Sequence, residues 1–140
     1  MTDADYVRLA AFRHALRSFL NFSETAAARI GLTGQQYQAL LVVRAMPAAS
    51  EMTVSELARQ LLIRHHSAVG LVDRLVDQAL LLRKASREDA RKVELRLTAK
   101  GSRVLGRLAD THRHEIAHAG PQLTALLEEI TQLTGPGSEP

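Results

Sequence analysis

The sequence predicts a mainly α-helical fold that carries one small β-hairpin. Most of the chain places apolar residues three or four positions apart, the period of an amphipathic helix. Only residues 81–84 and 93–97 have the pattern of strands, and a charged loop separates them. Basic residues are concentrated around these strands, since residues 59–107 hold 12 Lys and Arg against 5 Asp and Glu. Two short helices followed by a basic hairpin are typical of a winged helix-turn-helix.

Length and composition narrow the class of protein. The chain has 140 residues, the length of one domain, and its 46% hydrophobic content is enough for a packed core. It has no cysteine, which excludes disulfides and thiolate zinc sites. We find no apolar run near the roughly 20 residues of a membrane span and no basic signal-peptide start. We therefore expect a cytoplasmic protein with no membrane partner.

The first three helices follow from stripes and caps. A helix over residues 5–29 carries an apolar stripe formed by Leu9, Phe12, Leu16, Phe19 and Leu20. A second helix begins at the capping box of Thr33 and Gln36 and ends at Pro47. A second box, Thr53 with Glu56, starts a short helix that runs to about residue 61.

A fourth helix is expected over residues 63–79, and its first turn is polar. This turn reads Arg64, His65, His66 and Ser67. A helix of this kind enters the major groove of DNA and presents its N-terminal side chains to base edges. We predict that the two histidines and the serine contact bases, and that Arg64 reaches a phosphate or a base.

The two strands form the predicted wing. In the second, Val93, Leu95 and Leu97 alternate with Glu94 and Arg96, which predicts one apolar and one solvent face. The tip, residues 86–92, can enter an adjacent minor groove, whose negative potential attracts arginine. There we predict that Asp89 orients Arg91, and that Arg87 and Lys92 contact phosphates.

The ends of the chain predict dimerisation. A long helix is expected over residues 99–119, a break at Gly120 and Pro121, and a last helix over residues 121–133. The expected division is dimerisation helices at 1–31 and 99–134, a winged helix-turn-helix DNA-binding domain at 32–98 and a flexible tail at 135–140. The flanking helices are too apolar to stand alone in water, so we expect them to pair across a two-fold axis.

Five short motifs, in order, resemble the MarR family (multiple antibiotic resistance regulators). They are LTGQQY at residues 32–37, TVSELA at 53–58, LVDRLV at 71–76, REDAR at 87–91 and LTAKG at 97–101. The resemblance implies a homodimeric winged-helix transcription factor, usually a repressor released by a small ligand. Its DNA partner would be a palindrome with half-sites about 10 base pairs apart. The chain departs from common family patterns at Val69-Gly70, where a Thr-Arg-like pair is frequent, and at Ala79, where a glycine is frequent.

The segment HEIAH, residues 114–118, raises two alternatives. Histidines four apart with a glutamate between them are the spacing of a zinc peptidase helix, but such an enzyme needs a third ligand and a cleft. Glu128 and Glu129 are the possible third ligands. Alternatively, His114 and His118 with Glu24 or Glu115 form a regulatory zinc site. We prefer exposed or interface histidines, and we predict neither an enzyme nor a cofactor.

The sequence also raises the questions of an effector pocket and of a function other than DNA binding. A small-molecule effector is expected, and the candidate walls of its pocket are His14, Phe19 and Tyr37, although ordinary packing residues are the preferred interpretation. A basic adaptor that uses the winged fold to bind proteins or anionic surfaces is a third class of function. It differs from a DNA reader because its binding would not depend on Arg91 or on DNA sequence.

Overall fold

The computed structural model describes residues 1–132 and confirms the predicted fold class. It contains α1 (Asp3–Ala28), α2 (Gly34–Ala45), α3 (Val54–Leu61), α4 (His65–Asp77), β1 (Leu81–Ala85), β2 (Val93–Leu97) and α5 (Ala99–Gln132). The two strands form one antiparallel hairpin in which Leu81 pairs with Leu97 and Ala85 with Val93. The tail predicted at 135–140 lies outside the described residues.

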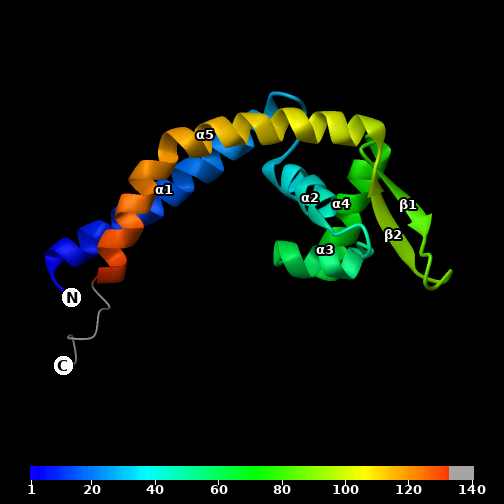
Figure 1. Ribbon diagram of the computed structural model, residues 1–140, viewed down its shortest axis with the longest axis horizontal. Helices are drawn as coiled ribbons and strands as arrows, with labels where there is room; N and C mark the ends of the chain where they lie inside the picture. Colours follow the sequence, from blue (N-terminus) through cyan, green and yellow to red (C-terminus); the bar gives the residue numbers. More distant parts are fainter. Residues whose placement is uncertain (133–140) are drawn as a thin grey trace.

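The molecule is an arch with two parts (Figure 1). α1 and the C-terminal half of α5 (residues 112–132) run antiparallel along each other, and we call this pair the arm. We call residues 34–97, which comprise α2, α3, α4 and the hairpin, the winged domain. The N-terminal half of α5 continues from the arm and packs on α2 and the hairpin of this domain. Within the described residues, no helix is both long and apolar enough to cross a membrane.

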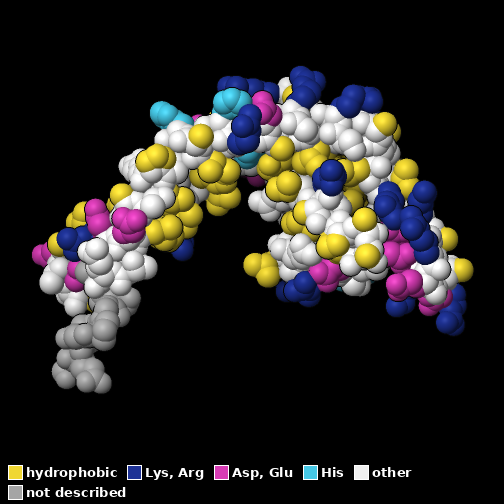
Figure 2. Space-filling model, in the orientation of Figure 1, with side chains coloured by type: hydrophobic (Ala, Val, Ile, Leu, Met, Phe, Trp, Pro, Cys, Tyr) yellow, Lys and Arg dark blue, Asp and Glu magenta, His cyan; other side chains and the backbone are white. Residues whose placement is uncertain are grey.

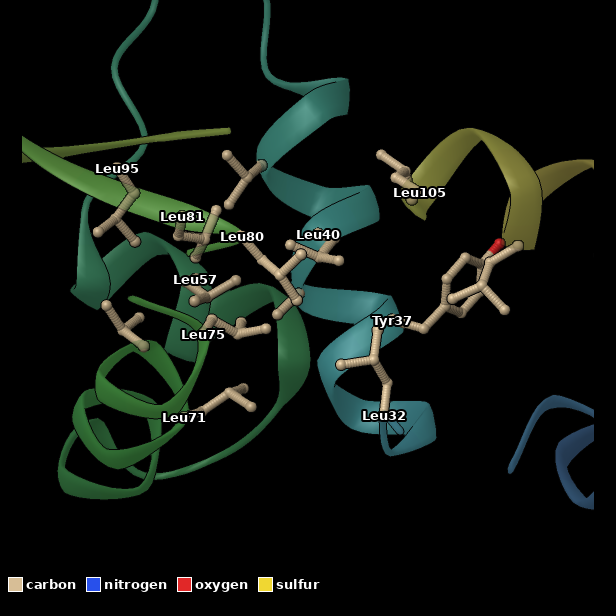
Figure 3. Packing of buried hydrophobic residues seen from close by; sticks show 14 of the residues in the cluster. Leu32, Tyr37, Leu40, Leu57, Leu71, Leu75, Leu80, Leu81, Leu95 and Leu105 are labelled. Atoms are coloured by element: carbon tan, nitrogen blue, oxygen red, sulfur yellow. The ribbon is translucent and has the colours of Figure 1, made fainter. Parts of the chain in front are cut away.

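The winged domain has a closed apolar core (Figure 3). Its helices and both strands contribute side chains that are at most 1% exposed, among them Leu40, Leu57, Leu71, Leu75, Leu81 and Leu95. Side-chain caps fix where α2 and α3 begin. Thr33 and Gln36 form the predicted reciprocal box, whereas Thr53 caps α3 from one side only, because the Glu56 carboxylate turns to Arg59.

The hairpin corrects one prediction. Glu94 was expected on the solvent face of β2, yet it is 3% exposed and pairs with Arg96, whose Nε lies 2.7 Å from its carboxylate. Val93, expected on the buried face, is 44% exposed. Alternation still separates the faces, but Val93 lies near the tip, beyond the core, and Glu94 lines a recess on the other face together with Pro47, Ala48, Ser50 and Met52.

The start of α5 is fixed against the turn that precedes β1. Thr98 donates its hydroxyl to the Ala79 carbonyl at 2.6 Å and accepts the Gly101 amide at 2.9 Å. A Cβ on Gly101 would lie 2.1 Å from the Leu80 carbonyl oxygen, so only glycine allows this approach. These contacts join the hairpin and the long helix at one end of the winged domain.

The predicted break in the last helix is wrong. α5 runs through Pro121 to Gln132 as one helix, although proline removes one backbone hydrogen bond. Beyond this point the helix still lies along α1 (Figure 1). Packing along the arm therefore outweighs the local cost of the proline.

A buried histidine joins the arm to the winged domain. His112 of α5 is 4% exposed, and its ring stacks on Tyr37 of α2 with 4.1 Å between centroids. Its Nδ1 lies 2.7 Å from the Leu108 carbonyl, so Nδ1 donates, and in the neutral ring Nε2 accepts from the Ser23 hydroxyl at 2.8 Å. His112 is thus a hydrogen-bonded residue of the core.

Candidate nucleic-acid interface

The first turn of α4 stands out from the core. The helix buries Ala68, Leu71, Val72 and Leu75, so its inward face is used for packing. The four residues predicted to contact DNA, namely Arg64, His65, His66 and Ser67, are all exposed. Arg64 is the N-cap of α4 and makes no side-chain cap bond, so the helix begins two residues later than predicted. The first amides of a helix lack partners within it and carry a partial positive charge, which suits a phosphate oxygen.

The turn between α3 and α4 is tight and slightly strained. Leu62 ends α3 with φ +56°, a left-handed conformation that is unfavourable for a residue with a side chain, and it is 92% exposed. The Ile63 amide then bonds back to the Ala58 carbonyl at 3.1 Å. His65 makes one long hydrogen bond to α3, in which its Nδ1 lies 3.4 Å from the Ser55 hydroxyl oxygen.

The wing brings Asp89 and Arg91 together. One Asp89 carboxylate oxygen accepts the Arg91 amide at 3.0 Å and its Nε at 3.3 Å, while the Arg91 side chain stays 92% exposed. The Arg91 amide and then its side chain lower the pKa of Asp89, so the carboxylate stays charged at neutral pH. The contact predicted from the spacing is present, and its role in a groove stays a prediction.

The hairpin tip has an internal frame. The Ser86 amide donates to the Lys92 carbonyl at 3.0 Å, and the Lys92 amide donates to the Asp89 carbonyl at 2.9 Å. Arg87 and Lys92, the predicted phosphate contacts, are exposed at the two ends of this loop. Lys and Arg side chains gather over the hairpin in Figure 2 and continue along the N-terminal half of α5.

Sequence reasoning missed two residues that support the tip of the wing. Glu51, in the loop between α2 and α3, accepts hydrogen bonds from the Ser86 hydroxyl and from the Arg87 amide, the latter at 2.8 Å. Ser86 is 7% exposed, although it begins a loop of charged residues. A serine at a loop start is a signal for side-chain bonds to the following amides. Glu51 lies 35 residues away in the sequence, and no local pattern reveals that pairing.

A match to a protein-family model covers most of the winged domain. Residues 30–92 match the MarR family model. The winged domain of this chain is therefore similar to that of the MarR family. No curated protein sequence matches the chain significantly.

Similar solved structures extend the likeness to the arm. AbsC, a MarR family transcriptional regulator from Streptomyces coelicolor, has a TM-score of 0.77 and 20% identity, with 97% of this chain and 93% of AbsC covered. RV1404 from Mycobacterium tuberculosis has a TM-score of 0.70 and 24% identity, with 95% and 94% covered. CouR, a transcriptional repressor solved with a 23-mer DNA duplex, has a TM-score of 0.69 and 25% identity, with 89% of each chain covered.

The two departures from MarR-family patterns have different structural meanings. A Cβ on Gly70 would meet one atom at van der Waals distance, the Nη1 of Arg74 at 3.5 Å. No backbone within the described residues therefore requires this glycine. Ala79 has φ +58°, so the chain places alanine in the left-handed conformation that the frequent glycine would occupy without strain.

The histidines of HEIAH do not meet a set of metal ligands. His114 is exposed, and its Nδ1 bonds to the Asp110 carbonyl at 2.8 Å, within its own helix. Glu24 instead accepts the Gly34 amide at 3.1 Å, and Glu129 lies 3.8 Å from Arg8 along the arm. Among residues 1–132, no three His, Asp or Glu side chains are grouped to hold a metal ion. Neither zinc alternative has a complete site there.

The candidate effector walls are largely packed together. Tyr37 is stacked on His112, and Phe19 meets the same ring edge-on with 6.1 Å between centroids. Burial raises the pKa of Tyr37, so its phenol stays protonated at neutral pH. His14 is exposed, with its Nε2 3.5 Å from the Ser18 hydroxyl. Two of the three residues are thus part of the joint between the arm and the winged domain.

Proposed function

We propose that this protein is a sequence-specific, homodimeric DNA-binding transcriptional regulator that acts as a repressor and is released by a small ligand. The observation that carries the proposal is Arg91, a 92% exposed cation at the tip of a basic wing, whose Nε lies 3.3 Å from the Asp89 carboxylate. An arginine held in this way loses less side-chain freedom when it enters a minor groove.

The winged domain supplies two modes of contact. The exposed first turn of α4 would present His65, His66 and Ser67 to base edges in the major groove, with Arg64 on a phosphate or a base. The wing would place Arg91 in the neighbouring minor groove, and Arg87 and Lys92 on the phosphates beside it. CouR, bound to a DNA duplex, supports this proposal through its similar fold.

The arm would pair two copies. Tyr6, Leu9, Leu16 and Leu20 share one face of α1 at about 100° per residue, and all four are exposed. A second stripe of α1, which includes Phe12 and Phe19, lies beside it and is partly buried. We propose that residues 1–31 and 99–134 form the dimer, and that residues 32–98 of each copy bind one half-site. Repression and release by a ligand rest on the resemblance to the MarR family.

A salt-titrated binding experiment tests the proposal. The protein would select duplex fragments from its own genome, and wild type, Arg91→Ala and Arg44→Ala would be compared on the best fragment. We expect Arg91→Ala to weaken specific binding by about 1–3 kcal/mol. Arg44 is an exposed arginine in the last turn of α2 and belongs neither to the residues proposed to contact DNA nor to the dimer helices, so its loss controls for net charge.

Two results contradict the proposal. One is equal binding to every duplex, which would indicate charge attraction without sequence reading. The other is a selected fragment whose binding does not change in Arg91→Ala, which would favour the basic adaptor.

A further inference from the structure

Glu51 connects the wing to the helix-turn-helix. It lies in the loop between α2 and α3 and is half-buried, two residues before Thr53, the residue that caps α3. Its two carboxylate oxygens have separate partners at the base of the wing. One accepts the Ser86 hydroxyl, and the other accepts the Arg87 amide at 2.8 Å. The same short loop therefore fixes both the start of α3 and the base of the wing tip.

The Ser86 hydroxyl links Glu51 to the backbone of the wing tip. It has one proton to donate and two lone pairs that can accept. The proton goes to Glu51, and the lone pairs face the amides of Glu88 and Asp89, both at 3.2 Å. All its bonding positions are used, which requires a partner that only accepts, as a carboxylate does. The Ser86 bond and then the Arg87 amide lower the pKa of Glu51, so that partner is charged at neutral pH.

The network ends at Arg91. Ser86 fixes the backbone of Asp89, and the Asp89 carboxylate binds the amide and Nε of Arg91. Pairing between β1 and β2 does not hold Asp89 or Arg91 in place, because the β1–β2 ladder ends at Ala85 and Val93. We propose that Glu51 and Ser86 are positioning residues for Arg91 and set its place relative to α4. The inference rests on the proposed function, since it concerns how the same DNA-binding surface is aligned.

The negative charge of Glu51 allows a test in which two explanations predict opposite changes in DNA affinity. Glu51 adds a negative charge close to the surface that would meet DNA. If it acted only through that charge, its removal would strengthen binding to a polyanion. If it positions Arg91, its removal weakens specific binding instead. The two accounts therefore predict opposite directions for one substitution.

The experiment compares four variants on the selected DNA fragment. Glu51→Gln keeps the size of the side chain, but its amide oxygen can accept from only one of the two donors. Ser86→Ala removes the hydroxyl without changing net charge. Glu88→Gln is the matched control, because Glu88 is exposed on the same wing and only its backbone amide joins the network. Arg91→Ala provides the background for combined variants.

We expect Glu51→Gln and Ser86→Ala each to weaken specific binding about fivefold to tenfold, the size of one or two lost hydrogen bonds. Glu88→Gln should leave binding unchanged or strengthen it. In the Arg91→Ala background, Glu51→Gln and Ser86→Ala should each change binding less than about twofold, because their effect passes through Arg91. A residue with a general structural role would cost the same in both backgrounds.

Each contrary outcome has a distinct meaning. If Arg91→Ala weakens specific binding while Glu51→Gln behaves like Glu88→Gln, the proposed function stands and the positioning role is wrong. Full additivity with Arg91→Ala also overturns the positioning role. If wild type shows no sequence preference, both the proposed function and this inference fail.

Discussion

The winged domain and the arm differ in how completely their apolar side chains are buried. The winged domain closes its core within one chain, with leucines from its helices and both strands at most 1% exposed. The arm consists of only two helices and leaves apolar side chains at the surface, among them Tyr6, Val7, Leu16, Leu20, Ile116 and Leu127. A pair of helices cannot bury two apolar faces of each member. The core of the winged domain is thus buried within one chain, whereas the exposed apolar side chains of the arm are those that the proposed dimer would cover.

The largest expected effect is loss of the dimer. Replacing Leu16 and Leu20 with glutamate places two charges per protomer in the proposed interface, and a two-fold axis repeats both. We expect the dissociation constant of the dimer to rise at least about a hundredfold. Sedimentation equilibrium measures this change.

Leu62→Glu is the control for the dimer experiment, because Leu62 is 92% exposed on the winged domain and outside the arm. It should leave the oligomeric state unchanged. A double variant of the arm that remains dimeric would show that α1 does not form the interface.

The joint between the two parts gives the next effect. Ser23→Ala removes the donor to the buried Nε2 of His112 and leaves that nitrogen unsatisfied. We expect the free energy of unfolding to fall by about 1–3 kcal/mol. Chemical denaturation measures it, with Ser18→Ala as the control, since Ser18 contacts His14 at the surface of the same helix. Equal effects of the two variants would contradict a structural role for the His112 joint.

The smallest effect is a gain in stability within the winged domain. Ala79→Gly relieves the left-handed conformation after α4, at φ +58°. We expect a stabilisation of about 0.5–1 kcal/mol, because the relief of strain exceeds the added freedom of the unfolded chain. Ala48→Gly lies in an exposed turn without positive φ and should destabilise slightly. Thermal unfolding distinguishes them, and a loss of stability in Ala79→Gly would contradict this account.

The sequence predicts the elements better than their interactions at a distance. Stripes and caps place the helices within a few residues, because these signals are local. The continuous α5 and the buried Glu94 could not be predicted, since each depends on a segment remote in the sequence. The same holds at the candidate interface. Asp89 and Arg91 are two residues apart and were paired correctly, whereas the bond of Ser86 to Glu51 spans 35 positions.

The most direct test of the central claim is a footprint of the protein on its selected DNA fragment. Hydroxyl-radical and base-methylation probes would be applied to wild type and to Arg91→Ala. We predict two protected half-sites about 10 base pairs apart and related by a two-fold axis. Arg91→Ala should lose the minor-groove protection and keep that of the major groove. A single protected site, or minor-groove protection unchanged in Arg91→Ala, would contradict the account of a dimer that reads DNA with α4 and the wing.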